Sequence, residues 1–119
     1  MIILDTNFLV YIMKYKLAYQ LEEHRKEIII PDQVINELYS LSKKARIKDR
    51  EAAKMALVLI EGWKIKKEET EGGADEAIKT LALKNKATVA TMDKLLIKEL
   101  KKSKIHILKI RQKRHLILD

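Results

Sequence analysis

The chain opens with Met1-Ile2-Ile3-Leu4-Asp5-Thr6-Asn7-Phe8-Leu9-Val10, and this stretch decides the fold. Ile2 to Leu4 form a short apolar run rich in β-branched residues, which is typical of a strand buried on both faces. The run stops at Asp5-Thr6-Asn7, residue types that favour turns and helix N-caps. An acid therefore lies where a central strand meets a helix, which is where open α/β sheets bind ligands. In this stretch alone, capping of the helix explains Asp5 equally well.

Length and composition predict a single globular domain spanning residues 1–119, because 119 residues suffice for one core and 47% of them are hydrophobic. No apolar run reaches the roughly 18–20 residues that span a bilayer, and no targeting segment is visible, so we expect a cytoplasmic protein without membrane contact. The chain contains no cysteine, which excludes disulfides, thiolate nucleophiles and cysteine-ligated zinc. The three histidines are scattered and do not predict a zinc site.

The net charge of +8 is concentrated near the C-terminus. Between Lys98 and Arg114 there are eight basic residues against one acid, Glu99. A one-sided basic segment predicts a polyanionic partner such as a nucleic acid. The alternative is a solvated lysine-rich surface, which is common when 35% of residues are charged. The candidate RNA-binding residues are Lys98, Lys101, Lys102, Lys104, Arg111, Lys113 and Arg114.

Strands and helices are expected to alternate along the chain. Runs of β-branched and alternating residues predict strands at 2–4, 27–30, 63–67, 87–91 and 105–110, with 116–118 pairing back at an edge. Helical spacing predicts one or two helices within 8–24, one capped by Asp32, and others at 48–60, from 74 onward, and at 94–102. This alternation predicts an α/β fold with a mostly parallel central sheet and helices on both faces.

The second half of the helix at 48–60 is apolar on nearly every side. Residues 55–60 read Met-Ala-Leu-Val-Leu-Ile. A helix that is hydrophobic all round is buried in a core or in an interface. This segment therefore predicts either a fully buried helix or the contact surface of a homodimer.

Four acids are expected to converge at one edge of the sheet. Asp5, Asp75 and Asp93 each fall where a strand ends or a helix begins. Glu37 borders the apolar stripe of its own helix, from which it can reach the other three. Each has a simpler interpretation: Asp75 and Asp93 can cap helices, and Glu37 can pair with a lysine. However, a carboxylate beside a buried face is costly unless it is paired or holds a metal.

Four converging carboxylates predict a divalent-metal site. Two like charges about 4 Å apart repel by about 4 kcal/mol at an effective dielectric constant near 20, so four cannot stay ionised together without cations. Oxygen-only ligands suit Mg²⁺ or Mn²⁺. Such ions activate water and stabilise the leaving oxygen of a phosphodiester. Beside a basic segment, this arrangement predicts a nuclease.

Over essentially its whole length the sequence resembles the PIN-domain ribonucleases. The matching motifs are Leu4-Asp5-Thr6-Asn7, Val34-Ile35-Asn36-Glu37-Leu38, Ala74-Asp75-Glu76 and Ala90-Thr91-Met92-Asp93-Lys94-Leu95-Leu96. The resemblance implies that Asp5, Glu37, Asp75 and Asp93 are catalytic and bind Mg²⁺ or Mn²⁺ for the hydrolysis of single-stranded RNA. It also implies that Asn7 and Thr91 orient the site and that Glu76 adds a further carboxylate behind the metal ligands.

The branch of this family is a separate question. The short chain and its lysine-rich end resemble the archaeal and eukaryotic branch that processes rRNA, so an endoribonuclease of pre-rRNA is the first expectation. The alternatives are the RNase toxin of a toxin–antitoxin pair and an RNA-binding ribosome-assembly factor without catalysis. A phospho-acceptor receiver-like domain is disfavoured, because Asp5 comes too early in the chain for it.

Overall fold

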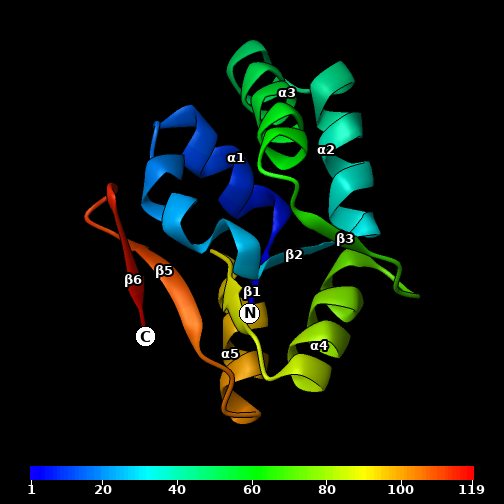
Figure 1. The fold of residues 1–119 in the computed structure, drawn as a ribbon, viewed down its shortest axis with the longest axis vertical. Helices are drawn as coiled ribbons and strands as arrows, with labels where there is room; N and C mark the ends of the chain where they lie inside the picture. The colour runs from blue at the N-terminus through cyan, green and yellow to red at the C-terminus, as the bar shows by residue number, and fades with distance from the viewer.

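The computed structural model describes all 119 residues as one α/β domain (Figure 1). Its strands are β1 (Ile2–Leu4), β2 (Ile28–Pro31), β3 (Lys66–Glu68), β4 (Thr88–Ala90), β5 (Ile107–Arg111) and β6 (His115–Leu118). Its helices are α1 (Thr6–Lys14), the 3₁₀ segment η1 (Ala18–Glu27), α2 (Asp32–Lys44), α3 (Ile47–Gly62), α4 (Ala74–Asn85) and α5 (Lys94–Lys102). No helix combines the length and the hydropathy needed to cross a membrane.

The six strands form one sheet in the order β3-β2-β1-β4-β5-β6. All neighbouring pairs are parallel except β5 and β6, which form an antiparallel hairpin at one edge. The chain runs outward from β1 through β2 to β3, and then returns to the other side of β1 to form β4. This reversal makes the gap between β1 and β4 a topological switch point, where ligands bind beyond the carboxyl ends of the strands. The predicted mostly parallel sheet is confirmed.

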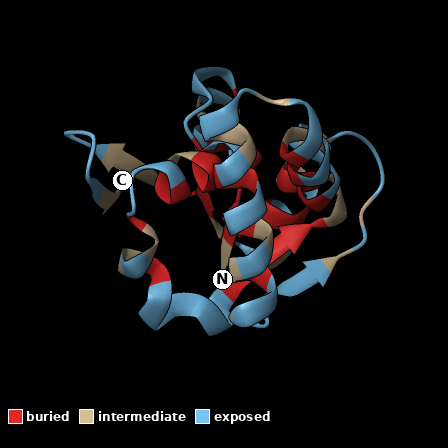
Figure 2. Cartoon of the chain, turned by 90° about the horizontal axis from the view of Figure 1, so that it is seen from above, coloured by how far each residue is buried: buried red, intermediate tan, exposed pale blue.

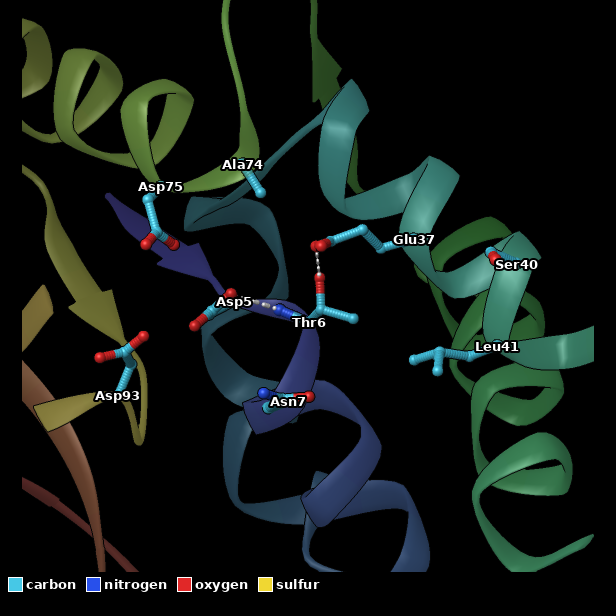
Figure 3. Close-up of a pocket in the computed structure, with 9 residues that line it drawn as sticks. All are labelled: Asp5, Thr6, Asn7, Glu37, Ser40, Leu41, Ala74, Asp75 and Asp93. Carbon is cyan, nitrogen blue, oxygen red and sulfur yellow. Dashed lines mark hydrogen bonds between the residues drawn. The ribbon is translucent and has the colours of Figure 1, made fainter. Parts of the chain in front are cut away.

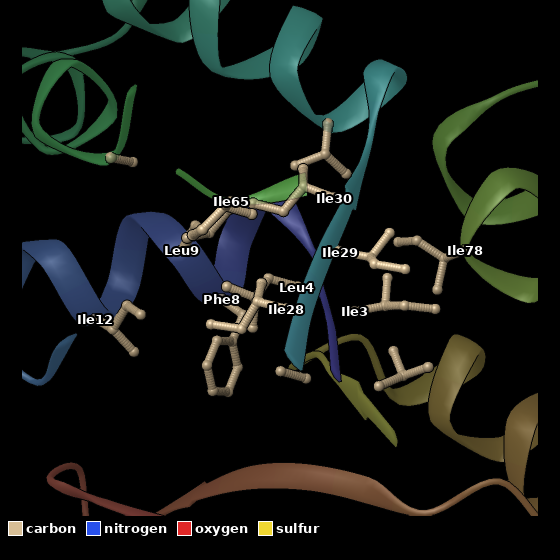
Figure 4. Close-up of a cluster of buried hydrophobic side chains, with 14 of the residues drawn as sticks. Ile3, Leu4, Phe8, Leu9, Ile12, Ile28, Ile29, Ile30, Ile65 and Ile78 are labelled. Carbon is tan, nitrogen blue, oxygen red and sulfur yellow. The ribbon is translucent and has the colours of Figure 1, made fainter. Parts of the chain in front are cut away.

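Both faces of the central strands are buried, because helices cover each side of the sheet. On one face Leu4 and Ile28 pack toward Phe8 of α1, and on the other Ile3 and Ile29 pack toward Ile78 of α4 (Figure 4). All six side chains are at most 3% exposed. In the burial view, the buried residues gather along the strands and on the inner faces of the helices (Figure 2). An apolar run without alternation, such as β1, is what this two-sided burial requires.

The segment after α3 departs from the predicted strand at 63–67. Trp63 ends the helix, and Lys64 takes a left-handed conformation with φ of 54°. The Ile65 amide then donates 3.0 Å back to Ile60 O, as in a Schellman helix end. Strand β3 consequently starts only at Lys66, because the preceding residues complete the helix terminus.

One further prediction needs correction, and the structure excludes one of the two alternatives for the helix at 48–60. Asp32 is not the N-cap of α2: Pro31 occupies that position with extended backbone, and Asp32 is the first helical residue, where its charge favours the helix dipole. Helix α3 is not fully buried either. Ala56 and Ile60 are in the core, but Met55 and Val58 are 50% and 72% exposed, so one apolar side of this helix faces solvent.

Candidate active site

A cavity of about 310 Å³ opens at the switch point between β1 and β4. All four predicted acids line it, together with polar side chains of α1 and α2 (Figure 3). The lining residues are Asp5, Thr6, Asn7, Glu37, Ser40, Leu41, Ala74, Asp75 and Asp93. The predicted convergence of the four carboxylates on one place is therefore correct. Each comes from a different part of the chain, and the parallel sheet brings them together.

Asp5 is the most buried of the four acids, with 8% exposure. Its amide donates 3.0 Å to Ala90 O, which extends the pairing of β1 with β4 to the rim of the cavity. Its Oδ1 accepts 2.8 Å from the Thr6 amide, and its Oδ2 accepts 2.8 Å from the Thr91 hydroxyl. Asp5 therefore caps α1 and lines the cavity at once, so the two interpretations of its role are compatible.

Burial raises the pKa of Asp5 above its ordinary value of 3.8. Desolvation is the largest cause, because it disfavours the charged carboxylate. The hydrogen bonds from Thr91 and Thr6 lower the pKa, whereas the nearby charges of Asp75 and Glu37 raise it further. Keeping Asp5 ionised in the folded protein therefore costs free energy, and a bound cation would lower that cost.

Asp93 also serves two purposes. Its Oδ1 accepts hydrogen bonds from the amides of Leu95 and Leu96, at 2.9 and 3.1 Å, which makes it the N-cap of α5. Its own amide donates 3.1 Å to Thr91 Oγ1. Thr91 is 1% exposed and joins the backbone of Asp93 to the carboxylate of Asp5. The predicted orienting role of Thr91 therefore has a structural basis.

Glu37 reaches the cavity from α2 and is held there by Thr6. The Thr6 hydroxyl donates 2.5 Å to Glu37 Oε1 (Figure 3). Glu37 takes part in none of the ion pairs of the structure, so the alternative of a lysine partner does not occur. Sequence reasoning did not identify Thr6 as a residue that positions Glu37, although Thr6 lies between two predicted site residues, Asp5 and Asn7.

Asp75 lies in the first turn of α4, behind a loop that Gln33 fastens to α2. Gln33 Nε2 donates 3.0 Å to Gly72 O and a second, shorter bond to Thr70 O. Gly72 takes a φ of 87°, which glycine adopts without steric cost. Gln33 thus links the helix that carries Glu37 to the segment that delivers Asp75. No sequence signal pointed to Gln33.

Asn7 and Glu76 are the other two residues predicted to support the site, and only Asn7 is at the cavity. Asn7 lines the cavity as expected, although it makes no hydrogen bond to an acid. Glu76 does not line it. The Glu76 carboxylate lies against Gly72. Its Oε2 atom is 2.6 Å from the point where a Cβ atom on residue 72 would lie. The prediction that Glu76 supports the metal ligands therefore finds no contact in this structure.

The donor set of the cavity is acidic and lacks a counter-charge. None of the nine lining residues is cationic, and none of the four acids takes part in an ion pair. As the side chains stand, no three acids are close enough together to bind one ion directly. The carboxylates instead surround a space, which suits Mg²⁺, a hard cation that keeps part of its water shell and uses few direct carboxylate ligands. The chemistry of the site thus fits a hydrated divalent cation.

The structure divides the predicted basic segment into two groups. Lys101, Lys102 and Lys104 lie at the C-terminal end of α5, whereas Asp93 caps its other end, so about 13 Å of helix separates them from the cavity. Because β5 is parallel to β4, Arg111 and the following turn lie at the carboxyl edge of the sheet, on the same side as the cavity. Lys113 and Arg114 belong to this second group.

The chain belongs to the PIN-like domain family, whose model matches residues 2–113. Within this family it is 36% identical over 122 residues to a protein of Methanocaldococcus jannaschii named Ribonuclease VapC4. That match covers 96% of this chain and 92% of the relative.

Two solved structures share the fold. One is a domain of a functionally unknown protein from Methanocaldococcus jannaschii, with a TM-score of 0.62 and 19% identity over 99% of this chain and 98% of that one. The other is VapBC2 from Rickettsia felis bound to a DNA fragment from its promoter, with a TM-score of 0.62 and 21% identity over 93% of this chain and 100% of that one. At these identities the likeness concerns the fold alone.

Proposed function

We propose that the chain is a metal-dependent endoribonuclease that hydrolyses single-stranded RNA. The observation that carries this proposal is the cavity at the β1/β4 switch point, where four carboxylates meet without a cationic side chain. The 36% identical relative named a ribonuclease supports RNA as the substrate. The alternative of an RNA-binding assembly factor without catalysis accounts less well for four acids around one cavity.

In the proposed mechanism, Asp5, Glu37, Asp75 and Asp93 would hold a hydrated Mg²⁺ or Mn²⁺, partly through its water ligands. When bound, such an ion supplies an activated water and neutralises charge on the scissile phosphate. The protein's own contribution is orientation. Thr91 holds the carboxylate of Asp5, and Thr6 holds that of Glu37, so both keep defined positions before substrate arrives.

For the biological role, the findings favour the toxin alternative over rRNA processing. The relative is named Ribonuclease VapC4, and this name supports the toxin branch of the family. We therefore propose an antitoxin protein as partner and a cellular RNA other than pre-rRNA as target. We also propose a homodimer through the exposed side of α3, because Met55 and Val58 make that surface apolar.

Cleavage of a structured RNA with single-stranded loops tests the activity. Wild type and Asp93→Asn are compared in Mg²⁺, in Mn²⁺ and in EDTA. We expect cutting by wild type only, and only with metal. Tight, salt-sensitive binding without cutting under any metal would support the assembly-factor alternative instead.

Expression in a bacterial host tests the role. If the protein is a toxin, induction of the wild type should arrest growth of the host, whereas induction of Asp93→Asn should not. Co-expression of the neighbouring gene, if it encodes the antitoxin, should restore growth. An rRNA-processing enzyme should instead leave growth unchanged in both cases.

A further inference from the structure

We propose that a tyrosine-rich basic surface beside the cavity binds the RNA strand as it leaves the active site. This surface, here the tyrosine surface, consists of Tyr11, Tyr15, Lys16, Tyr19, Lys113 and Arg114. It rests on the proposed ribonuclease function and specifies where the substrate lies. In this arrangement, bases stack on the tyrosine rings and phosphates meet the three basic side chains.

The tyrosine surface is linked to the neighbourhood of the active site by a second depression. A depression of about 370 Å³ beside the cavity is lined by Thr91 and Lys94, which flank the acidic site, and by Tyr11 and Lys113. Tyr11 and Lys113 also line the next depression, of about 640 Å³, whose other walls include Tyr15 and Tyr19. The shared residues Tyr11 and Lys113 connect the two depressions, and Thr91 and Lys94 place the first of them next to the acids in the chain.

Hydrogen bonds hold the two sides of the tyrosine surface together. The Tyr11 hydroxyl donates 3.1 Å to Lys113 O, and Gln20 Nε2 donates 2.8 Å to Arg114 O. Gln20 Oε1 in turn accepts 3.0 Å from the Leu116 amide. These contacts fix the β5–β6 turn against α1 and η1, segments that lie side by side in Figure 1. A fixed surface binds its ligand with a smaller loss of conformational entropy.

The aromatic rings are available for stacking. Tyr15 and Tyr19 are 53% and 68% exposed, so they contribute little to the core. The rings of Tyr11 and Tyr15 lie with their centroids 4.5 Å apart, which makes one extended aromatic surface. Three of the four tyrosines of the chain are gathered here.

The charges of this surface are also available. Lys16, Lys113 and Arg114 take part in none of the ion pairs, whereas Lys101 and Lys109 both pair with Asp119. Exposed aromatic rings alternating with free cations are the features by which proteins bind single strands of nucleic acid with little sequence preference. A double helix would hide its bases from the rings. The partner that fits this surface is therefore single-stranded RNA.

Fluorescence anisotropy with a labelled single-stranded RNA of about 12 nucleotides tests the proposal, a length within the usual site sizes. All proteins carry Asp93→Asn, so that the labelled RNA stays uncut while binding is measured. Tyr15→Ala with Tyr19→Ala should weaken affinity about tenfold or more, because each lost stacking partner weakens binding several-fold. The paired Tyr→Phe variants should restore it, since stacking needs the ring and not the hydroxyl.

The matched aromatic control is Tyr39→Ala on α2, where Tyr39 is 52% exposed and lies outside the tyrosine surface. The charge variant Lys113→Gln/Arg114→Gln should lower the slope of log affinity against log salt by about 0.7 per charge. Its control is Lys84→Gln/Lys86→Gln at the end of α4, with the same change in net charge. Unchanged RNA affinity in the tyrosine and charge variants would overturn the proposal and assign this surface to a protein partner.

Cleavage kinetics separate this proposal from the proposed function. In the active background, the tyrosine variant should raise KM for a long RNA while kcat stays unchanged. A trinucleotide that reaches only the cavity should be cut equally well by both proteins. Absence of cleavage by wild type would refute the nuclease function, whereas the anisotropy result would still decide whether RNA binds the tyrosine surface.

Discussion

The Thr91 hydroxyl donates a 2.8 Å hydrogen bond to Asp5 Oδ2, joining residues 86 positions apart in sequence. The same Thr91 oxygen accepts a 3.1 Å bond from the Asp93 amide. One buried threonine thus connects two acids that follow neighbouring strands. The relative placement of Asp5 and Asp93 depends on this side chain as well as on the sheet.

Replacement of Thr91 by valine tests this dependence. Valine keeps the shape but removes one of the two hydrogen-bond donors of the buried Asp5 carboxylate, so we expect a loss of about 1–3 kcal/mol in the free energy of unfolding. Cleavage should fall with it, because the Asp5 carboxylate becomes free to rotate. Thr91→Ser should recover most of both. Denaturant unfolding and kcat measure the two effects, and a fully active valine variant would contradict the orienting role.

Asp5→Asn should stabilise the metal-free protein at pH 7. Because the folded-state pKa of Asp5 is raised above 3.8, the folded state binds this proton more tightly than the unfolded state. Stability therefore falls as pH rises from about 4 through the folded-state pKa, and the penalty persists at neutral pH. Asparagine carries no such penalty.

Thermal unfolding in EDTA at pH 3 to 8 should thus give Asp5→Asn an advantage that disappears below about pH 4. The same substitution should abolish metal-dependent cleavage and the stabilisation of wild type by Mn²⁺. An equal or lower melting temperature for Asp5→Asn at pH 7 would show that the ionised carboxylate is well accommodated without metal.

Two variants of Asp93 separate its capping role from its catalytic role. Asparagine is as good an N-cap as aspartate, so Asp93→Asn should fold normally and lose cleavage. Asp93→Ala should lose cleavage and also about 1 kcal/mol of stability, because the amides of Leu95 and Leu96 lose their acceptor. An active Asp93→Asn protein would mean that the residue acts only as a cap.

Gln33→Leu should loosen the loop before Asp75. The side chain keeps its size but no longer donates to Thr70 O and Gly72 O. We expect faster hydrogen exchange at residues 69–75 and a higher Mn²⁺ concentration for half-maximal cleavage, with α2 still folded. Lys43→Ala, an exposed change on the same helix, is the control. Unchanged metal dependence would make the contact purely structural.

The two basic groups should contribute unequally to RNA binding. Arg111→Gln/Lys113→Gln/Arg114→Gln removes charges at the cavity edge of the sheet, and Lys101→Gln/Lys102→Gln/Lys104→Gln removes the same number at the far end of α5. We expect the first set to weaken binding more, since a strand that occupies the cavity reaches the nearer charges. Affinity at several salt concentrations measures this. A larger effect from the second set would place the RNA path along α5.

Much of the fold could be predicted from local patterns. The continuous apolar run Ile2–Leu4 fits only a strand covered on both faces, and the helix spacing after Asp93 fixed the bounds of α5. The strand at 63–67 was less predictable, because alternating residues there also suit a helix end followed by a reversal. The chain reverses at Lys64, which has a positive φ, and a lysine side chain does not predict that conformation.

The sequence by itself predicted which acids line the cavity, since Asp5 and Asp93 follow neighbouring parallel strands, whose carboxyl ends meet at one edge of the sheet. Only the tertiary structure decided what holds those acids and where substrate can go. Thr6, Thr91 and Gln33 act through contacts with residues far away in the chain, and such pairs leave no periodic pattern in sequence. The basic segment likewise looked uniform, but the parallel direction of β5 carries Arg111 to Arg114 toward the cavity and leaves Lys101 at the opposite end.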